Sequence, residues 1–121
     1  MNDTEFKRVD IKLVSDMLYG EEKYVNEFAI ASIDSFSEFS EHYALYLMQR
    51  DMENLRKTGH KIKPVAQMLK VDEILNEYDQ AKLMLINNAS DEKLQQSVDT
   101  VTSICDEVLN DFKKMAEMTK E

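Results

Sequence analysis

The chain of 121 residues contains 43% hydrophobic and 32% charged residues, which is the composition of one globular domain rather than of a disordered tail. Its formal net charge of -9 argues against a broad nucleic-acid surface, because such a surface needs clustered Lys and Arg. Two glycines and one proline are too few for the many tight turns of an all-β chain. We therefore expect residues 1–121 to form a single all-α domain.

Two further features predict a cytoplasmic protein that does not enter a membrane. Cys105 is the only cysteine, so an intramolecular disulfide or a cysteine-cluster zinc site cannot form, and a small buried apolar group is its simplest interpretation. No apolar run approaches the ~20 residues of a membrane span, and residues 1–10 lack the apolar core of a signal peptide.

The first two predicted helices occupy residues 9–19 and 21–48. The first is short, and its apolar residues recur at helical spacing from Val9. Gly20 follows at the position where a helix often ends with a residue in the left-handed conformation. The second is much longer and carries an aromatic core face. Its apolar stripe consists of Val25, Phe28, Ala29, Ser32, Ile33, Phe36, Phe39, Tyr43, Tyr46 and Leu47.

The third and fourth helices are each predicted to follow an aspartate. Asp51 has the side chain of an N-cap residue, and core positions recur behind it every three or four residues as far as Leu69. Asp72 is placed to cap the fourth helix, in which the stem of Lys82 can lie along the apolar seam. The stripe of the fourth helix consists of Ile74, Leu75, Tyr78, Ala81, Leu85 and Ile86.

The strongest helical signal follows the turn-like run NNASD. Seven residues keep an unbroken three-four spacing: Leu94, Val98, Val101, Cys105, Val108, Phe112 and Met115. Such a narrow stripe suits a coiled-coil partner or antiparallel packing within one chain, and the other predicted helices have enough apolar surface to cover it. We therefore expect a monomeric up-and-down four-helix bundle with a short extra N-terminal helix.

A histidine lies within a basic stretch of the third helix. Core positions at 55, 59, 62, 66 and 69 leave Arg56, His60, Lys63 and Gln67 on the adjacent stripe, so His60 is expected to face outward or to lie half exposed. Between residues 50 and 70, six basic residues and two acidic ones give a local charge of +4, so the other 100 residues total -13. This patch could stabilise a phosphoryl group on the imidazole or attract an acidic protein. The alternative is a solvated helix face that carries an ordinary histidine.

The stretch that begins at Asp51, DMENLRKTGHKIKP, resembles the phosphoacceptor helix of histidine phosphotransfer (HPt) domains, the intermediate carriers of two-component phosphorelays. In that family an Asp that starts the helix and then a Leu precede the acceptor histidine, at the spacing of Asp51, Leu55 and His60. The family's His-x-x-Lys-Gly pattern corresponds to residues 60–64. The resemblance covers the whole chain, since HPt domains have a four-helix bundle, often a short leading helix, and the acceptor on the second bundle helix.

The chain departs from the family pattern at two positions. Pro64 occupies the position of the family's glycine, and Lys70 stands where a second glycine commonly follows. A small residue one turn after the histidine leaves room for the incoming receiver domain, whereas a proline ring narrows that room. Proline also removes a backbone donor, so we expect the helix to bend or break beside His60.

The resemblance implies that His60 accepts a phosphoryl group from an aspartyl phosphate of a response-regulator receiver domain and passes it to another receiver. Lys63 would neutralise charge on the phosphoryl oxygens. The residues that could add donors or partner contacts are Arg56, Lys57, Lys61 and Gln67. The expected partners are receiver domains and a hybrid histidine kinase. The magnesium ion would belong to the receiver, so the chain is expected to need no cofactor of its own.

Other functions remain open at this point. A non-catalytic or degenerate HPt-like module would bind a receiver or another protein without accepting phosphate, and Pro64 favours it. A helix-pair oligomerisation protein would depend on the regular last helix. A histidine-kinase dimerisation domain resembles a two-helix hairpin with an acidic residue after the histidine, whereas Lys61 follows His60 here.

Autonomous kinase activity is not expected, because the chain has no G-x-x-x-x-G-K-[ST] loop. His42 has no second histidine four residues away, which favours a surface or core-edge residue over a metal ligand.

Overall fold

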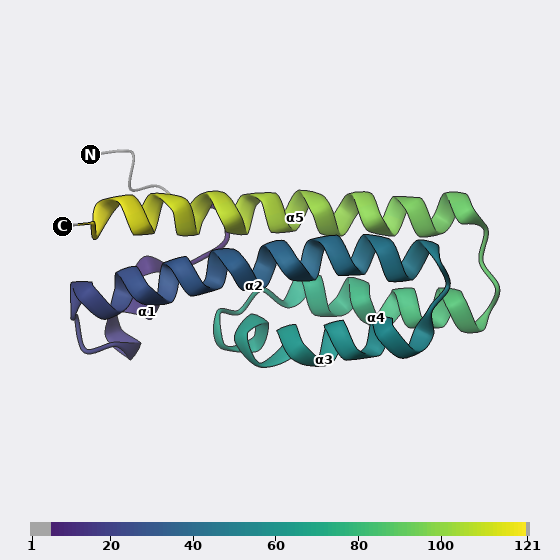
Figure 1. The fold of residues 1–121 in the computed structure, drawn as a ribbon, viewed down its shortest axis with the longest axis horizontal. Helices are drawn as coiled ribbons and strands as arrows, with labels where there is room; N and C mark the ends of the chain where they lie inside the picture. Colours follow the sequence, from purple (N-terminus) through teal and green to yellow (C-terminus); the bar gives the residue numbers. More distant parts are fainter. Residues whose placement is uncertain (1–5, 121) are drawn as a thin grey trace.

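The computed structural model describes residues 6–120, and within that range the chain forms five helices and no strand (Figure 1). The helices are α1 (Ile11–Met17), α2 (Glu22–Met48), α3 (Met52–Met68), α4 (Asp72–Ile86) and α5 (Asp91–Met118). The all-α prediction is confirmed, and each expected helix is present. None of these helices combines the length and the apolar character needed to cross a bilayer.

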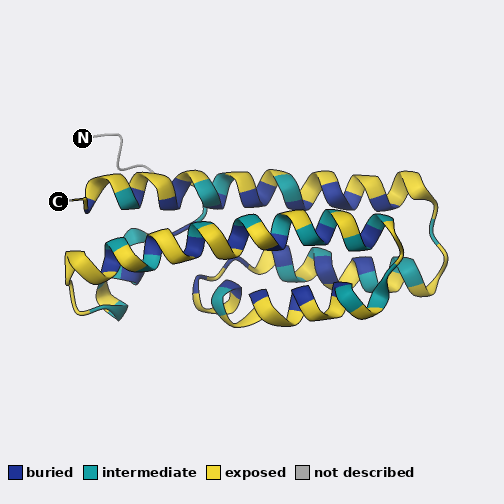
Figure 2. Ribbon diagram, in the orientation of Figure 1, coloured by how far each residue is buried: buried dark blue, intermediate teal, exposed yellow. Residues whose placement is uncertain are grey.

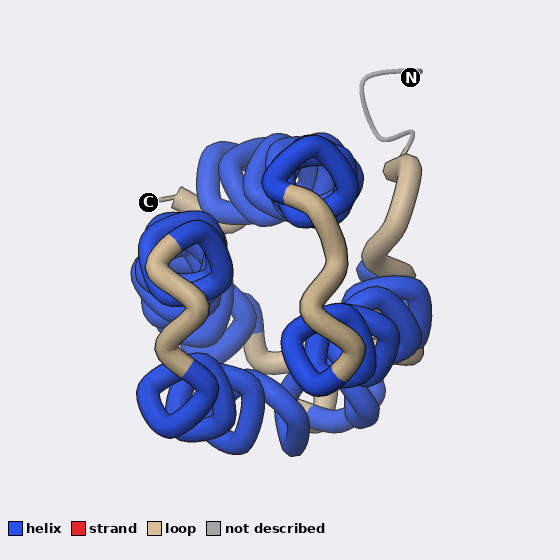
Figure 3. The backbone as a smooth tube through the Cα atoms, turned by 90° about the vertical axis from the view of Figure 1, so that its right-hand side faces the viewer, coloured by secondary structure: helices blue, strands red, loops and turns tan. Residues whose placement is uncertain are grey.

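The four longer helices lie side by side, and each packs against two others. α2 packs against α5 and α3, and α4 packs against the same two helices, while α1 contacts α2. Viewed toward their ends, the helices are grouped around a common centre (Figure 3). Buried and exposed residues alternate along each helix (Figure 2). This alternation is what the apolar stripes in the sequence predict, because one face of each helix is covered by its neighbours. Ile86 is an exception, because this last residue of the predicted stripe of α4 is 65% exposed.

The pairing of α2 with α5 supplies the centre of the core. All seven residues of the predicted α5 stripe are buried, Cys105 included. Phe112 of this stripe stacks on Phe36 and meets the edge of Phe28, with ring centroids 6.1 and 5.9 Å apart. Burial raises the pKa of the Cys105 thiol to about 12, which agrees with its interpretation as a small buried apolar group.

A buried hydroxyl joins three helices inside this core. The Tyr43 hydroxyl of α2 lies 2.7 Å from the Ser97 hydroxyl of α5 and donates to the Glu77 carbonyl of α4 at 3.3 Å. Burial raises the pKa of Tyr43 above its usual value, so the hydroxyl keeps its proton. The buried Tyr43 hydroxyl therefore has hydrogen-bond partners, and it would lose one of them if Ser97 were replaced by an apolar residue.

The N-terminal ends of α3, α4 and α5 differ in how they are capped. Asp51 accepts a hydrogen bond from the Asn54 N–H at 3.1 Å, so its predicted N-cap role is confirmed. The prediction for Asp72 is wrong, because this residue is already helical and the cap residue, Val71, makes no side-chain bond. Ser90 caps α5.

The helix ends reverse the chain with residues in the left-handed conformation. After α1 that residue is Tyr19, with φ 58°, although Gly20 is also left-handed with φ 72°. Arg50, Lys70 and Asn88 have φ between 57° and 61° after the following three helices. At each of these four helix ends, the residue after the left-handed one donates its N–H to the carbonyl of the residue five positions before it, as in a Schellman motif. Tight turns are therefore made here largely without glycine.

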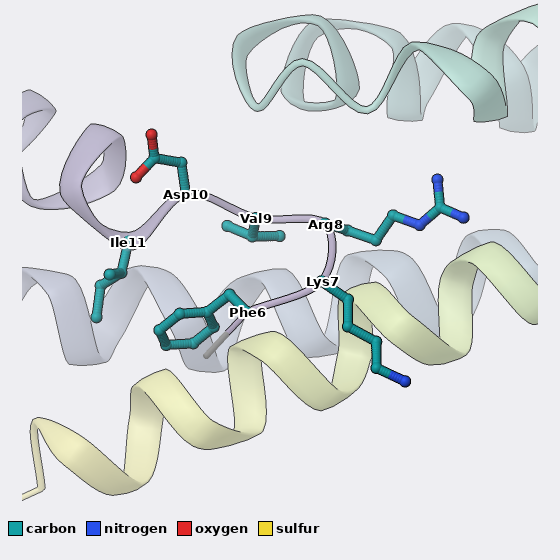
Figure 4. Close-up of a pocket in the computed structure, with 6 residues that line it drawn as sticks. All are labelled: Phe6, Lys7, Arg8, Val9, Asp10 and Ile11. Atoms are coloured by element: carbon teal, nitrogen blue, oxygen red, sulfur yellow. The ribbon is translucent and has the colours of Figure 1, made fainter. Parts of the chain in front are cut away.

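The segment before α1 is held by a buried carboxylate. α1 begins at Ile11, so the prediction that its helical stripe starts at Val9 is wrong, and Val9 is buried ahead of the helix. Asp111 of α5 accepts hydrogen bonds from the backbone N–H groups of Lys7, Arg8 and Val9 at 3.0, 2.7 and 2.9 Å. Figure 4 shows this segment running beside α5.

Arg8 extends the same anchor to two helices. Its guanidinium donates to Glu107 of α5 at 2.7 Å and also pairs with Glu73 of α4. The hydrogen bonds to these carboxylates raise the pKa of Arg8, and the bond from Arg8 lowers that of Glu107. The segment at residues 6–10 therefore ties α4 to α5.

Replacing Asp111 with Asn should destabilise the protein by about 1–3 kcal/mol, because the amide keeps one acceptor oxygen while three N–H groups need partners and that of Val9 is buried. Urea unfolding followed by circular dichroism measures the change. Asp106→Asn is the matched control, since Asp106 is an exposed aspartate of the same helix. Equal unfolding midpoints for the two variants would contradict the anchoring role.

Candidate functional site

The α3 helix carries the predicted site and is continuous through Pro64 as far as Met68. Of the two expected outcomes, a bend or a break, the break is therefore absent. In Figure 1 the last turn of α3, at its left end, is drawn nearly end-on, whereas the earlier turns are seen from the side. The helix thus bends toward its C-terminal end, as proline within a helix predicts.

His60 lies on the solvent-facing side of α3, and its predicted exposure is confirmed. Lys63, one turn further along, is also exposed. The remaining predicted site residues are exposed as well: Arg56, Lys57, Lys61 and Gln67. The opposite face of the helix is buried through Leu55, Thr58, Gly59, Ile62 and Ala66. The helix period therefore separates a core face from a charged face that carries the imidazole.

A close contact with α4 supports the turn of α3 that precedes His60. A Cβ atom built on Gly59 would overlap the Tyr78 ring, so only glycine allows the ring to lie this close to the helix. The Tyr78 hydroxyl reaches the Arg56 carbonyl at 3.5 Å, a weak hydrogen bond. Lys82 lies along the seam as expected, with its ammonium 4.4 Å from the centre of the Tyr78 ring.

Carboxylates pair with two of the cations around His60. The Lys61 ammonium donates to Glu38 of α2 at 2.6 Å, and Lys57 lies 3.7 Å from Glu53 of its own helix. The hydrogen bond from Lys61, together with its charge, lowers the pKa of Glu38. Neither Arg56 nor Lys63 has such a carboxylate within 4.0 Å among residues 6–120. The positive charge that remains for an anionic ligand is therefore concentrated on these two residues.

The other histidine lies outside this charged face. His42 of α2 is half-buried, and its ring centre is 5.3 Å from that of Tyr46. It is thus the core-edge residue that the sequence predicts. In the described part of the chain, no three His, Cys, Asp or Glu side chains are grouped so that they could hold a metal ion.

Two contributors to the site were not predicted as such. Glu38 is one of these, because no sequence signal pairs it with Lys61, which is 23 residues away. The second is the contact between Gly59 of α3 and Tyr78 of α4. A glycine at a core position of a helix indicates that another element approaches the backbone closely there, but it does not identify that element. Both contacts depend on how the helices pack.

Comparison of the chain with protein-family models, with curated proteins and with solved structures found no match. The likeness to HPt domains therefore depends on the residues of the sequence motif, and the structure adds the exposure and the surroundings of His60.

Gly59→Ala should destabilise the protein by about 1–3 kcal/mol, because the new methyl group overlaps the Tyr78 ring. In a Tyr78→Ala background the same change should be neutral or stabilising by up to about 1 kcal/mol, since alanine is the better helix former. Thermal and urea unfolding of the four proteins completes this double-mutant cycle. Equal effects in both backgrounds would exclude the contact as the cause.

The pH dependence of the pair between Glu38 and Lys61 follows from the lowered pKa of Glu38. A lowered folded-state pKa means that the pair stabilises the protein above the ordinary glutamate pKa, and that this contribution is lost as the pH falls through the lowered value. Carboxyl NMR titration should show the Glu38 pKa rising in Lys61→Gln and unchanged in Lys57→Gln. A Glu38 pKa that is the same in wild type and Lys61→Gln would disprove the pairing in solution.

Proposed function

We propose that this protein is a histidine phosphotransfer carrier of a phosphorelay, in which His60 accepts a phosphoryl group from one receiver domain and passes it to another. The observation that supports this most is an exposed imidazole with an exposed cation about one turn away on either side, Arg56 and Lys63. Neither cation is paired with a carboxylate among residues 6–120. The rest of the chain is acidic, so this local charge is not a general property of the surface.

The proposal includes the bundle architecture that such carriers have. α2, α3, α4 and α5 form an up-and-down four-helix bundle, and α1 is the short extra helix at its N-terminal side. Supporting this, α2 and α4 each pack against both α3 and α5. The acceptor is then on the second bundle helix, as in the family that the motif resembles. We further propose that the protein acts as a monomer in the cytoplasm.

The reaction is a reversible group transfer. A ring nitrogen of neutral His60 forms a bond to the phosphorus of an aspartyl phosphate, and the bond from phosphorus to the aspartate oxygen breaks. The bonding electrons leave with the aspartate carboxylate, and the second ring nitrogen can keep its proton. Lys63 offsets charge on the phosphoryl oxygens during the transfer. The magnesium ion that assists this chemistry belongs to the receiver domain.

The basic face also provides the means to attract a partner. Exposed cations on α3 complement an acidic surface on a receiver domain and accelerate association at low ionic strength. Lys57, Lys61 and Gln67 lie beside the acceptor and are proposed to contact the receiver. A hybrid histidine kinase would supply the phosphoryl group to the first receiver.

A second candidate is a degenerate carrier that binds a receiver without accepting phosphate. Pro64 favours this possibility, because it is exposed one turn after His60, where the family has a small residue. Its ring occupies part of the space that a receiver domain would enter. The two candidates differ in whether His60 becomes phosphorylated, so one assay separates them.

His60→Gln should abolish phosphoryl acceptance from phosphorylated receiver domains without lowering the unfolding midpoint, because His60 is exposed on the helix. His42→Gln is the matched control and should accept phosphate as the wild type does. Acid-labile, base-stable phosphate on the chain is the readout. Equal labelling of wild type and His60→Gln would refute the acceptor assignment.

Measuring the binding of a receiver domain to the wild-type chain separates the degenerate carrier from a protein that does not bind receivers. A wild-type chain that binds a receiver but never acquires phosphate would identify the degenerate carrier. In that case Pro64→Gly should restore measurable transfer if the proline ring is the obstacle.

A further inference from the structure

The open space beside His60 lies toward the N-terminal part of α3. Arg56, Lys57, His60 and Lys61 line a surface hollow there. Helical side chains lean toward the N-terminus of their helix, so a residue covers the surface over the turn that precedes its own Cα. A group attached to the His60 imidazole therefore lies over the turn that carries Arg56 and Lys57.

The C-terminal side of the imidazole carries Lys63 and Pro64. Pro64 is exposed one turn after His60, and its ring takes up space that the family leaves to a small residue. Lys63 is exposed but does not line the hollow. A phosphoryl group in the hollow would therefore find its donors among the three cations that line it, of which Arg56 and Lys57 lie on the N-terminal side of His60.

Of the three cations that line the hollow, Arg56 is the one without a carboxylate partner in the described part of the chain. Lys57 lies beside Glu53, and Lys61 donates to Glu38. Arg56 is four residues before His60, a spacing that places the two Cβ atoms about 5–6 Å apart on one helix face. A guanidinium also offers two parallel N–H donors, which match two phosphoryl oxygens.

We propose that Arg56 holds the phosphoryl group of phosphorylated His60, so that the phosphoryl site is built from the N-terminal side of the histidine. This inference rests on the proposed function and assigns Arg56 a specific role in it. The turn that bears Arg56 is itself supported from behind by the contact between Gly59 and Tyr78.

The test uses a small-molecule phosphoryl donor, so that it does not depend on a receiver domain. In a His42→Gln background His60 is the only histidine of the chain. Phosphoramidate forms a nitrogen–phosphorus bond at its imidazole and releases ammonia. Phosphorus NMR then follows the last ionisation of the phosphoryl group as the pH is varied.

A nearby cation favours the dianion and lowers the phosphoryl pKa. Arg56→Gln should therefore raise that pKa by about 0.3–0.7 of a unit, in the range of exposed charge pairs. Arg56→Lys should raise it less, because the charge is kept and only the paired donors are lost. Lys57→Gln removes the same charge one residue away and should raise the phosphoryl pKa by less than half as much as Arg56→Gln.

Equal pKa increases in Arg56→Gln and Lys57→Gln, or none in either, would overturn the assignment of Arg56. The proposed function is tested separately, by phosphoryl transfer from a receiver domain to His60. An Arg56 effect on chemically phosphorylated His60 without any receiver transfer would retain the phosphoryl site and reject the phosphorelay role. Transfer from a receiver without an effect of Arg56→Gln on the phosphoryl pKa would retain the phosphorelay role and reject the assignment of Arg56.

Discussion

Burial of the apolar stripe of α5 against α2 is the interaction on which the other helix contacts depend. Phe112 lies at its centre, between the rings of Phe28 and Phe36. Full burial of one large apolar side chain contributes about 1.5–3 kcal/mol, whereas an exposed ion pair contributes at most about 1 kcal/mol. The stripe therefore determines which helices are neighbours, and α4 and the N-terminal segment then attach to surfaces that α5 provides. Asp111 lies on the same helix, so the N-terminal anchor also depends on this packing.

The α3 helix combines a rigid side and a chemically available side. Gly59 allows Tyr78 to approach the backbone closely, and the adjacent residue, His60, is exposed to solvent. A side chain on a supported helix keeps its position better than one on a loop, and this suits a group that must meet a reacting atom on a partner. The bend toward the C-terminal end of α3 comes after this supported turn.

Ion pairing distributes the positive charge of α3 unevenly. Lys57 and Lys61 have carboxylate neighbours, while Arg56 and Lys63 do not have them within the described residues. A count of basic residues in the sequence treats all four as equivalent. The packing of α2 beside α3 changes this for Lys61, because it brings Glu38 to that residue. Glu53 lies near Lys57 within α3 itself, and Arg56 lines the hollow without such a partner in the described part of the chain. The proposed phosphoryl site depends on that difference.

The sequence by itself determined the helices, most of the buried stripes and the exposure of His60, because these follow from local periodicity and need no knowledge of neighbouring elements. It failed at Asp72 and Val9, where the start of a helix depends on contacts made elsewhere. It also gave no sign that Tyr19 and Arg50 would adopt the left-handed conformation that glycine usually supplies. Only the tertiary structure decided that Asp111 binds the N-terminal segment, that Tyr78 covers Gly59 and that Glu38 takes Lys61. Each of these contacts joins residues far apart in the chain, and their partners are selected by the packing of whole helices rather than by local spacing.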